Sequence, residues 1–84
     1  MVMLLYFASV RERVGKGEER IALPEGLSDV RALIDWLATR GEGYAEAFAD
    51  TRTLRAAIDQ RFAPLDPPIA GAREIALFPP VTGG

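Results

Sequence analysis

The sequence predicts an α+β domain in which a mixed sheet of about five strands carries one main helix on one face. Three observations predict this class. The length of 84 residues fits one small domain, apolar strand-like runs stand near both ends of the chain, and one segment between them has strong helical periodicity. The predicted order is two strands, the helix, one or two strands and a final strand, and this order with one main helix favours a mixed sheet whose first and last strands are adjacent and central.

The first strand is predicted over residues 2–8. This run is apolar without alternation and too short for a typical helix, as in a strand that is buried on both faces. Residues 9–15 follow with two valines four positions apart and Gly15 at the end. That pattern predicts one or two helical turns that the glycine terminates.

A second strand is predicted over residues 19–23. Ile21 and Leu23 fall on one side of this segment, as in a half-buried strand, and Pro24 ends it. The short turn at residues 16–18 joins it to the preceding helical turns. We therefore expect the first two strands to be antiparallel.

The main helix is the most clearly patterned element of the chain. Ser28 is a preferred N-cap residue and Asp29 falls in the first turn, while Arg40 in the last turn and Gly41 just past it suit a C-terminus. Residues 44–50 predict a second, shorter helix. Apolar residues at helical spacing form the stripe of the main helix: Val30, Leu33, Ile34, Leu37 and Ala38.

The last third of the chain contains further strand signals. Residues 54–63 form either one strand or two strands that bend near Asp59 and Gln60, and the pattern does not separate these alternatives. Residues 73–78 predict the final strand, which ends where two prolines begin. We therefore divide the chain into a folded domain at 1–78 and a flexible, projecting C-terminal reactive tail at 79–84.

The tail has a composition suited to entering another protein. Pro79 and Pro80 favour an extended path and cannot donate sheet hydrogen bonds, so Phe78 is expected to be the last anchored residue. Six residues reach about 20 Å. Gly83 and Gly84 have no Cβ and therefore fit a narrow channel, with the carboxylate of Gly84 as the reactive group.

The composition excludes several kinds of chemistry. The chain has no cysteine and no histidine, which removes thiolate nucleophiles, disulfides and the commonest metal ligands, so we expect no bound metal and no bound cofactor. The acidic residues are scattered, and pairs such as Glu18 and Glu19 are typical of a solvated face.

Charge and hydropathy limit the partners and the compartment. With a net charge of −2, the chain offers no basic surface for nucleic acid. The apolar run at residues 2–8 is too short to cross a membrane and lacks the features of a signal peptide, so we expect no membrane partner and a cytoplasmic location.

Three segments resemble the small, sulfur-carrying subunits of molybdopterin synthase. LFPPVTGG at residues 77–84 resembles the C-terminal signature of that family, YFASVRE at 6–12 its first strand and following turn, and AIDQ at 57–60 its middle strand. Asp59 departs from the asparagine expected by this resemblance, which puts a local turn contact in doubt. The resemblance covers nearly the whole chain and implies a ubiquitin-like β-grasp fold.

The resemblance also implies a mechanism and a set of partners. An ATP-dependent activating enzyme would adenylate the Gly84 carboxylate, and a sulfur donor would convert it to a thiocarboxylate. The tail, Pro79, Pro80, Val81, Thr82 and Gly83, would thread into the large subunit of a heterotetramer and deliver sulfur to cyclic pyranopterin monophosphate, forming the dithiolene of molybdopterin. The chain itself would be non-catalytic, and ATP would be used only by the activating partner.

The family docks through an apolar sheet surface, which corresponds here to Phe7, Phe62 and Phe78. Phe7 and Phe62 have the alternative interpretation of ordinary core residues, because exposed aromatic rings on a small monomer need a partner to cover them. Two other functions remain open: a sulfur carrier for thiamine synthesis or tRNA thiolation, and a protein modifier whose terminus joins a lysine.

Overall fold

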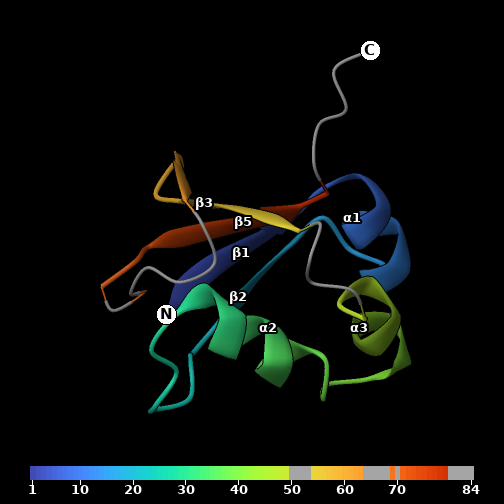
Figure 1. Ribbon diagram of the computed structural model, residues 1–84, viewed down its shortest axis with the longest axis horizontal. Coiled ribbons are helices and arrows are strands. Elements are labelled where there is room, and N and C mark those ends of the chain that lie inside the picture. The colour runs from blue at the N-terminus through green and yellow to red at the C-terminus, as the bar shows by residue number, and fades with distance from the viewer. Residues whose placement is uncertain (50–53, 64–68, 70, 80–84) are drawn as a thin grey trace.

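The described residues form a five-stranded mixed sheet, with α2 and α3 on one side of it and α1 at one end (Figure 1). This computed structural model describes residues 1–49, 54–63, 69 and 71–79. The elements in chain order are β1 (Val2–Tyr6), α1 (Ala8–Val14), β2 (Glu18–Ile21), α2 (Val30–Leu37), α3 (Glu42–Ala47), β3 (Arg55–Ile58), β4 (Arg61–Ala63) and β5 (Glu74–Phe78).

The strand order across the sheet is β2-β1-β5-β3-β4. β1 pairs antiparallel with β2 and parallel with β5, and β5 pairs antiparallel with β3 on its other side. The predicted antiparallel first pair and the adjacent, central first and last strands are therefore confirmed. The α+β class, the sheet of about five strands and the predicted β-grasp arrangement of the strands are confirmed as well.

β1 is fully buried on one face only. Val2, Leu4 and Tyr6 are at most 2% exposed, whereas Met3 and Leu5 between them are half-buried. The prediction of burial on both faces is wrong because the helices cover only the face that contains Leu4. The other face, over which none of the described helices lies, is called the open sheet face below and carries in register Met3, Leu5, Ala57, Ala76 and Phe78.

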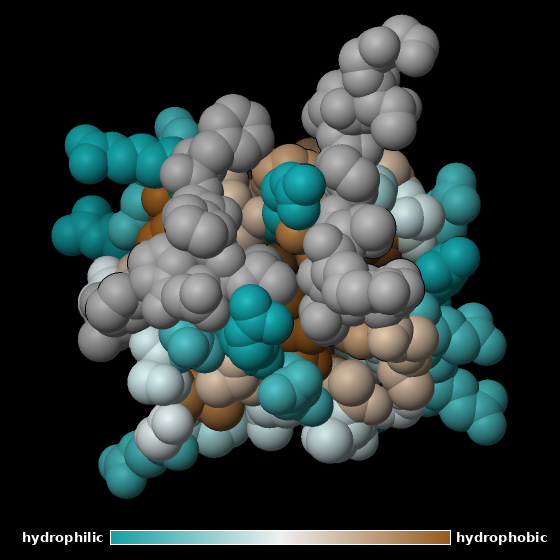
Figure 2. Space-filling model, viewed as in Figure 1, coloured by the Kyte–Doolittle hydropathy of each residue, from teal (hydrophilic) through white to brown (hydrophobic). Residues whose placement is uncertain are grey.

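The core lies between the covered sheet face and α2. The apolar stripe predicted for the main helix supplies four completely or almost completely buried side chains: Val30, Leu33, Ile34 and Leu37. They pack with Leu4, Ile75 and Leu77 from the two central strands. Hydrophilic side chains lie along much of the outline of the molecule, and apolar residues show mainly between them (Figure 2).

The ends of α2 differ from the prediction by one and three residues. Asp29, not Ser28, is the N-cap: its Oδ1 accepts the Ala32 N–H at 2.8 Å. Ser28 stays outside the helix because its carbonyl accepts the Ile69 N–H at 3.2 Å. The helix ends at Leu37, and Arg40 lies beyond it in a tighter turn, where its N–H donates to the Leu37 carbonyl.

The two short helices pack against each other. α1 ends as predicted at Gly15, whose φ of 92° is in the left-handed region. α3 begins two residues earlier than predicted, because it starts at Glu42 after the extended Gly41. Gly43 faces α1 so closely that an added Cβ would lie 2.5 Å from the Arg13 carbonyl oxygen.

Residues 54–63 contain two strands, which settles the alternative that the sequence left open. β3 and β4 form an antiparallel hairpin around Asp59 and Gln60, whose φ angles of 49° and 70° fit a two-residue turn with the twist of the strands. The Asp59 carboxylate accepts the N–H groups of Arg73 at 2.9 Å and Glu74 at 3.0 Å. The turn contact that was in doubt is therefore made by the aspartate.

Glu19 is the centre of a polar cluster between β2 and the helices. Its carboxylate accepts hydrogen bonds from the Tyr6 and Tyr44 hydroxyls, both at 2.7 Å, and from Arg40 Nη1 at 3.0 Å. The Glu19 side chain is only 11% exposed. The prediction of a solvated pair thus holds for Glu18 and is wrong for Glu19, because Glu19 faces the helices opposite Leu4.

Burial and the hydrogen bonds of this cluster shift the pKa values of its members. Burial alone would raise the pKa of Glu19, but hydrogen bonds from Tyr6, Tyr44 and Arg40 outweigh burial and lower it. Burial and the bond to Glu19 raise the pKa of both tyrosine hydroxyls, which keep their protons. The Arg40 guanidinium also lies over the rings of Trp36 and Tyr44, at 5.3 and 4.9 Å from their centroids.

Candidate functional site: the tail exit

Because β1 and β5 pair in parallel, the carboxyl ends of both strands lie at the same edge of the sheet. Tyr6 is opposite Leu77, and the next residue, Phe7, donates its N–H to the Leu77 carbonyl at 3.2 Å. Phe78 and Pro79, both half-buried, follow on β5. We call this edge, with Phe7, Phe78 and Pro79, the tail exit, because residues 79–84 begin here.

Phe7 presents its ring at the tail exit. It is 48% exposed and, with Met1, is one of the two exposed large hydrophobic residues of the described part of the chain. Phe7 is extended and Ala8 has a φ of 53°, so the chain turns sharply from β1 into α1 at this point. The alternative that Phe7 is a core residue does not hold, and its contact with a partner stays a prediction.

The other predicted interface residues lie along β5 and β4. Phe78 is half-buried on the open sheet face, opposite Arg55 of β3. Phe62 is opposite Ala57 in the β3–β4 ladder. The side chain of Phe62 lies outside the described part of the structure, as do five predicted tail residues: Pro80, Val81, Thr82, Gly83 and Gly84.

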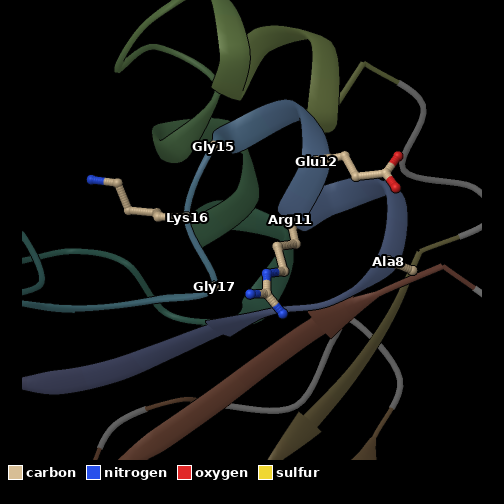
Figure 3. A pocket seen from close by; sticks show the side chains of 6 residues that line it. All are labelled: Ala8, Arg11, Glu12, Gly15, Lys16 and Gly17. Carbon is tan, nitrogen blue, oxygen red and sulfur yellow. The ribbon is translucent and has the colours of Figure 1, made fainter.

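A shallow depression of about 550 Å³ lies beside α1, next to the tail exit. Figure 3 shows that its charged side chains diverge: Lys16 and Glu12 point away from each other, and only Arg11 reaches toward Gly17. These side chains do not converge on a common point where a substrate would react. Nor does the described part of the chain contain a group of three residues placed to hold a metal ion.

Two arginines at the tail exit were not identified by the sequence analysis. Arg11 follows Phe7 by one turn of α1, and Arg55 is paired with Phe78. Phe7 is the extended N-cap that precedes α1, so its spacing from Arg11 is not an i, i+4 pair within a helix and gave no signal. Arg55 offered no signal either, because its neighbour Phe78 is distant in sequence.

The fold and the exit together define a class of protein. A mixed sheet with its first and last strands parallel at the centre and one main helix against it is typical of the small β-grasp proteins. The chain belongs to the ThiS family, which it matches over residues 4–84.

Three curated relatives share the name molybdopterin synthase sulfur carrier subunit. The proteins of Escherichia coli and Haemophilus influenzae are 38% and 37% identical to this chain over 84 residues, which is 100% of each chain. The Mycosarcoma maydis protein is 36% identical over 87 residues, covering 99% of this chain and 92% of that protein.

Solved structures show the same fold. The putative molybdopterin converting factor subunit 1 of Pyrococcus furiosus has a TM-score of 0.72 and 30% identity, covering 95% of this chain and 97% of that one. SAMP1 of Haloferax volcanii has a TM-score of 0.69 and 25% identity, covering 99% and 98%. Within the described residues, every helix is too short or too polar to traverse a bilayer.

Proposed function

We propose that the chain carries sulfur on the carboxyl group of Gly84 and donates it within a molybdopterin synthase. The observation that carries this proposal is the similarity to two bacterial sulfur carrier subunits, 38% and 37% identical over 100% of each chain. The structure supports it because β5, the strand that precedes residues 79–84, ends beside an exposed aromatic ring, Phe7.

The chemistry of the carrier uses its terminal carboxyl group. The Gly84 carboxylate attacks the α-phosphorus of ATP on an activating enzyme, which releases pyrophosphate and forms an acyl-adenylate. A sulfur nucleophile then attacks the carbonyl carbon and AMP leaves, so that the terminus becomes a thiocarboxylate. A thiocarboxylate is ionised at neutral pH and nucleophilic without a neighbouring base, which fits a chain without cysteine or histidine.

The body of the protein positions this group in the partner. Phe7, Phe62 and Phe78 dock on the large subunit of a heterotetramer, while residues 79–84 enter its active site. There the thiocarboxylate transfers sulfur to cyclic pyranopterin monophosphate, and two such transfers build the dithiolene. The large subunit supplies the catalytic groups, and this chain binds no cofactor of its own in the reaction.

Intact mass spectrometry of the protein purified from cells tests the proposal. We expect a population in which one oxygen is replaced by sulfur, and fragmentation should place the replacement at Gly84. A variant that lacks Gly84 serves as the control and should show none. A second polypeptide joined through the terminus would instead identify a protein modifier, and an unmodified terminus in cells that make molybdopterin would contradict the carrier function.

A further inference from the structure

Two arginine side chains lie on opposite sides of the tail exit. Across the sheet, β5 has β1 on one side and β3 on the other. Arg11 lies on the β1 side, in α1, where its N–H bonds to the Phe7 carbonyl at 3.4 Å. Arg55 lies on the β3 side, directly opposite Phe78. Along the sheet, the tail exit therefore has one arginine on each side.

Neither guanidinium forms an ion pair with a carboxylate of the described residues. Both arginines are exposed. Glu12, the acidic neighbour of Arg11, points away from it (Figure 3). The Arg55 Nη1 donates to the carbonyl of Leu54, the preceding residue, at 3.2 Å. Arg40 is different, because it is bonded to Glu19 and stacked on two rings.

Unpaired arginines of this kind contribute little to the stability of the fold, because exposed charges are well solvated. They also contrast with the chain as a whole, which carries a net charge of −2. The planar guanidinium is suited to binding a carboxylate through two parallel hydrogen bonds. Protein interfaces typically surround an apolar centre with a polar rim, and the tail exit combines the exposed ring of Phe7 with exposed arginines on both sides of β5.

We propose that Arg11 and Arg55 form a cationic rim around the tail exit that pairs with carboxylates on the protein surface surrounding the channel that receives the tail. The inference rests on the proposed function, since insertion of the tail is what brings the exit against a partner. Opposite charges at a rim speed the encounter and orient it before the apolar contacts close. The partner of the tail exit is thus a protein with an acidic channel mouth.

Association kinetics with the molybdopterin synthase large subunit test the rim. We would measure the association rate and Kd of the native chain, Arg11→Gln, Arg55→Gln and the double variant at about 20 mM and about 500 mM salt. Each single substitution should weaken binding about two- to fivefold at low salt, mainly through slower association. The association rate of the native chain should fall between low and high salt, and the double variant should lose most of this difference.

Two kinds of control are needed. One tests whether the position of the arginine matters, and the other tests whether its charge, and not its packing, causes the effect. Arg73→Gln removes an exposed arginine just before the start of β5, the end of that strand far from the exit, and should leave both constants unchanged. Arg11→Lys and Arg55→Lys keep the charge and should keep the salt dependence of the association rate. Thermal unfolding of each variant verifies that the substitution leaves the fold intact.

The outcomes distinguish the rim from the proposed function. If the double variant associates at the native rate with native salt dependence, the rim is wrong, while a thiocarboxylate on Gly84 in the same preparation leaves the carrier function in place. If the native chain acquires no thiocarboxylate in cells that make molybdopterin, the carrier function fails and the rim fails with it.

Discussion

At the scale of single residues, Glu19 joins three parts of the fold through one carboxylate. It binds β1 through Tyr6, α3 through Tyr44 and the segment after α2 through Arg40. Hydrogen bonds to a charged group are worth about 1.5–3 kcal/mol each when intact, and the loss of the charge leaves the partners less well satisfied. The cluster therefore makes stability depend on the ionisation of one side chain.

We expect Glu19→Gln to lower the free energy of unfolding by about 1–3 kcal/mol at pH 7, measured by urea denaturation. Because the folded pKa of Glu19 lies below its unfolded value, its contribution is present above the unfolded pKa, about 4.3, and is lost as the pH falls through the folded pKa. The variant should lack this part of the acid dependence. The exposed neighbour provides the control, Glu18→Gln, and equal acid dependence in both variants would contradict the role of Glu19.

Asp59 acts locally, at the turn between β3 and β4. Asp59→Ala should destabilise the protein by about 1–2 kcal/mol, because alanine lacks the acceptor for two N–H groups and tolerates the positive φ poorly. Asp59→Asn keeps both properties and should change stability by less than about 0.5 kcal/mol. Asp59→Gly keeps only the conformation, so its stability, measured by urea denaturation, should fall between the two. An alanine variant as stable as the asparagine variant would count against the contact.

At the scale of elements, the close approach of α1 and α3 depends on the absence of a side chain at Gly43. Gly43→Ala should cost about 1–3 kcal/mol, since the added Cβ would lie 2.5 Å from the Arg13 carbonyl oxygen and would push the helices apart. Gly41→Ala is the matched control, because its Cβ meets only a Tyr44 ring carbon at 3.8 Å. Thermal unfolding of both variants tests the difference, and equal midpoints would show that the helices adjust freely.

Elements with a local pattern were predictable from the sequence. The buried stripe of α2 follows from helical spacing, and the end of α1 follows from Gly15. The sequence alone does not show which of two adjacent residues, Ser28 or Asp29, is the N-cap of α2. That depends on a distant residue, because the Ser28 carbonyl accepts the Ile69 N–H. Nor does it show that β1 is covered on one face only, which depends on where the helices pack.

The tail exit was predictable in part. The resemblance supplied Phe7 and Phe78 as interface residues, and the predicted adjacency of the first and last strands brought them near each other. The partners of Glu19 lie 13, 21 and 25 residues away along the chain, so no local pattern indicates them. No local pattern indicates the two arginines of the tail exit either, because a sequence does not show which charged side chains form ion pairs in the fold.

At the scale of the whole molecule, the proposed function separates a folded body from a C-terminus that reacts in the active sites of other proteins. Adding one alanine after Gly84 leaves the body unchanged but moves the carboxylate by about 3.5 Å and places a Cβ at the end of the tail. Binding to the large subunit should persist. Adenylation should fall to background, because a displacement of about 1 Å already costs around a hundredfold in rate.

ATP–pyrophosphate exchange with the activating enzyme measures this effect. The native chain, assayed beside the extended chain, provides the reference rate. Normal exchange by the extended protein, followed by normal thiocarboxylate formation, would show that Gly84 is not the reactive residue. Loss of binding to the large subunit would instead show that the added residue disturbs docking.

The parallel pairing of β1 with β5 also decides where the protein can be attached to something else. Because the two strands run in the same direction, the start of β1 lies at the edge opposite the tail exit, and Met1 there is 80% exposed. A fluorophore, an affinity tag or a solid support joined at Met1 would project away from the proposed docking surface at the tail exit. A label on Phe7 would stand at the exit itself. The N-terminal amine is therefore the position at which the protein can be tethered while the tail exit remains accessible.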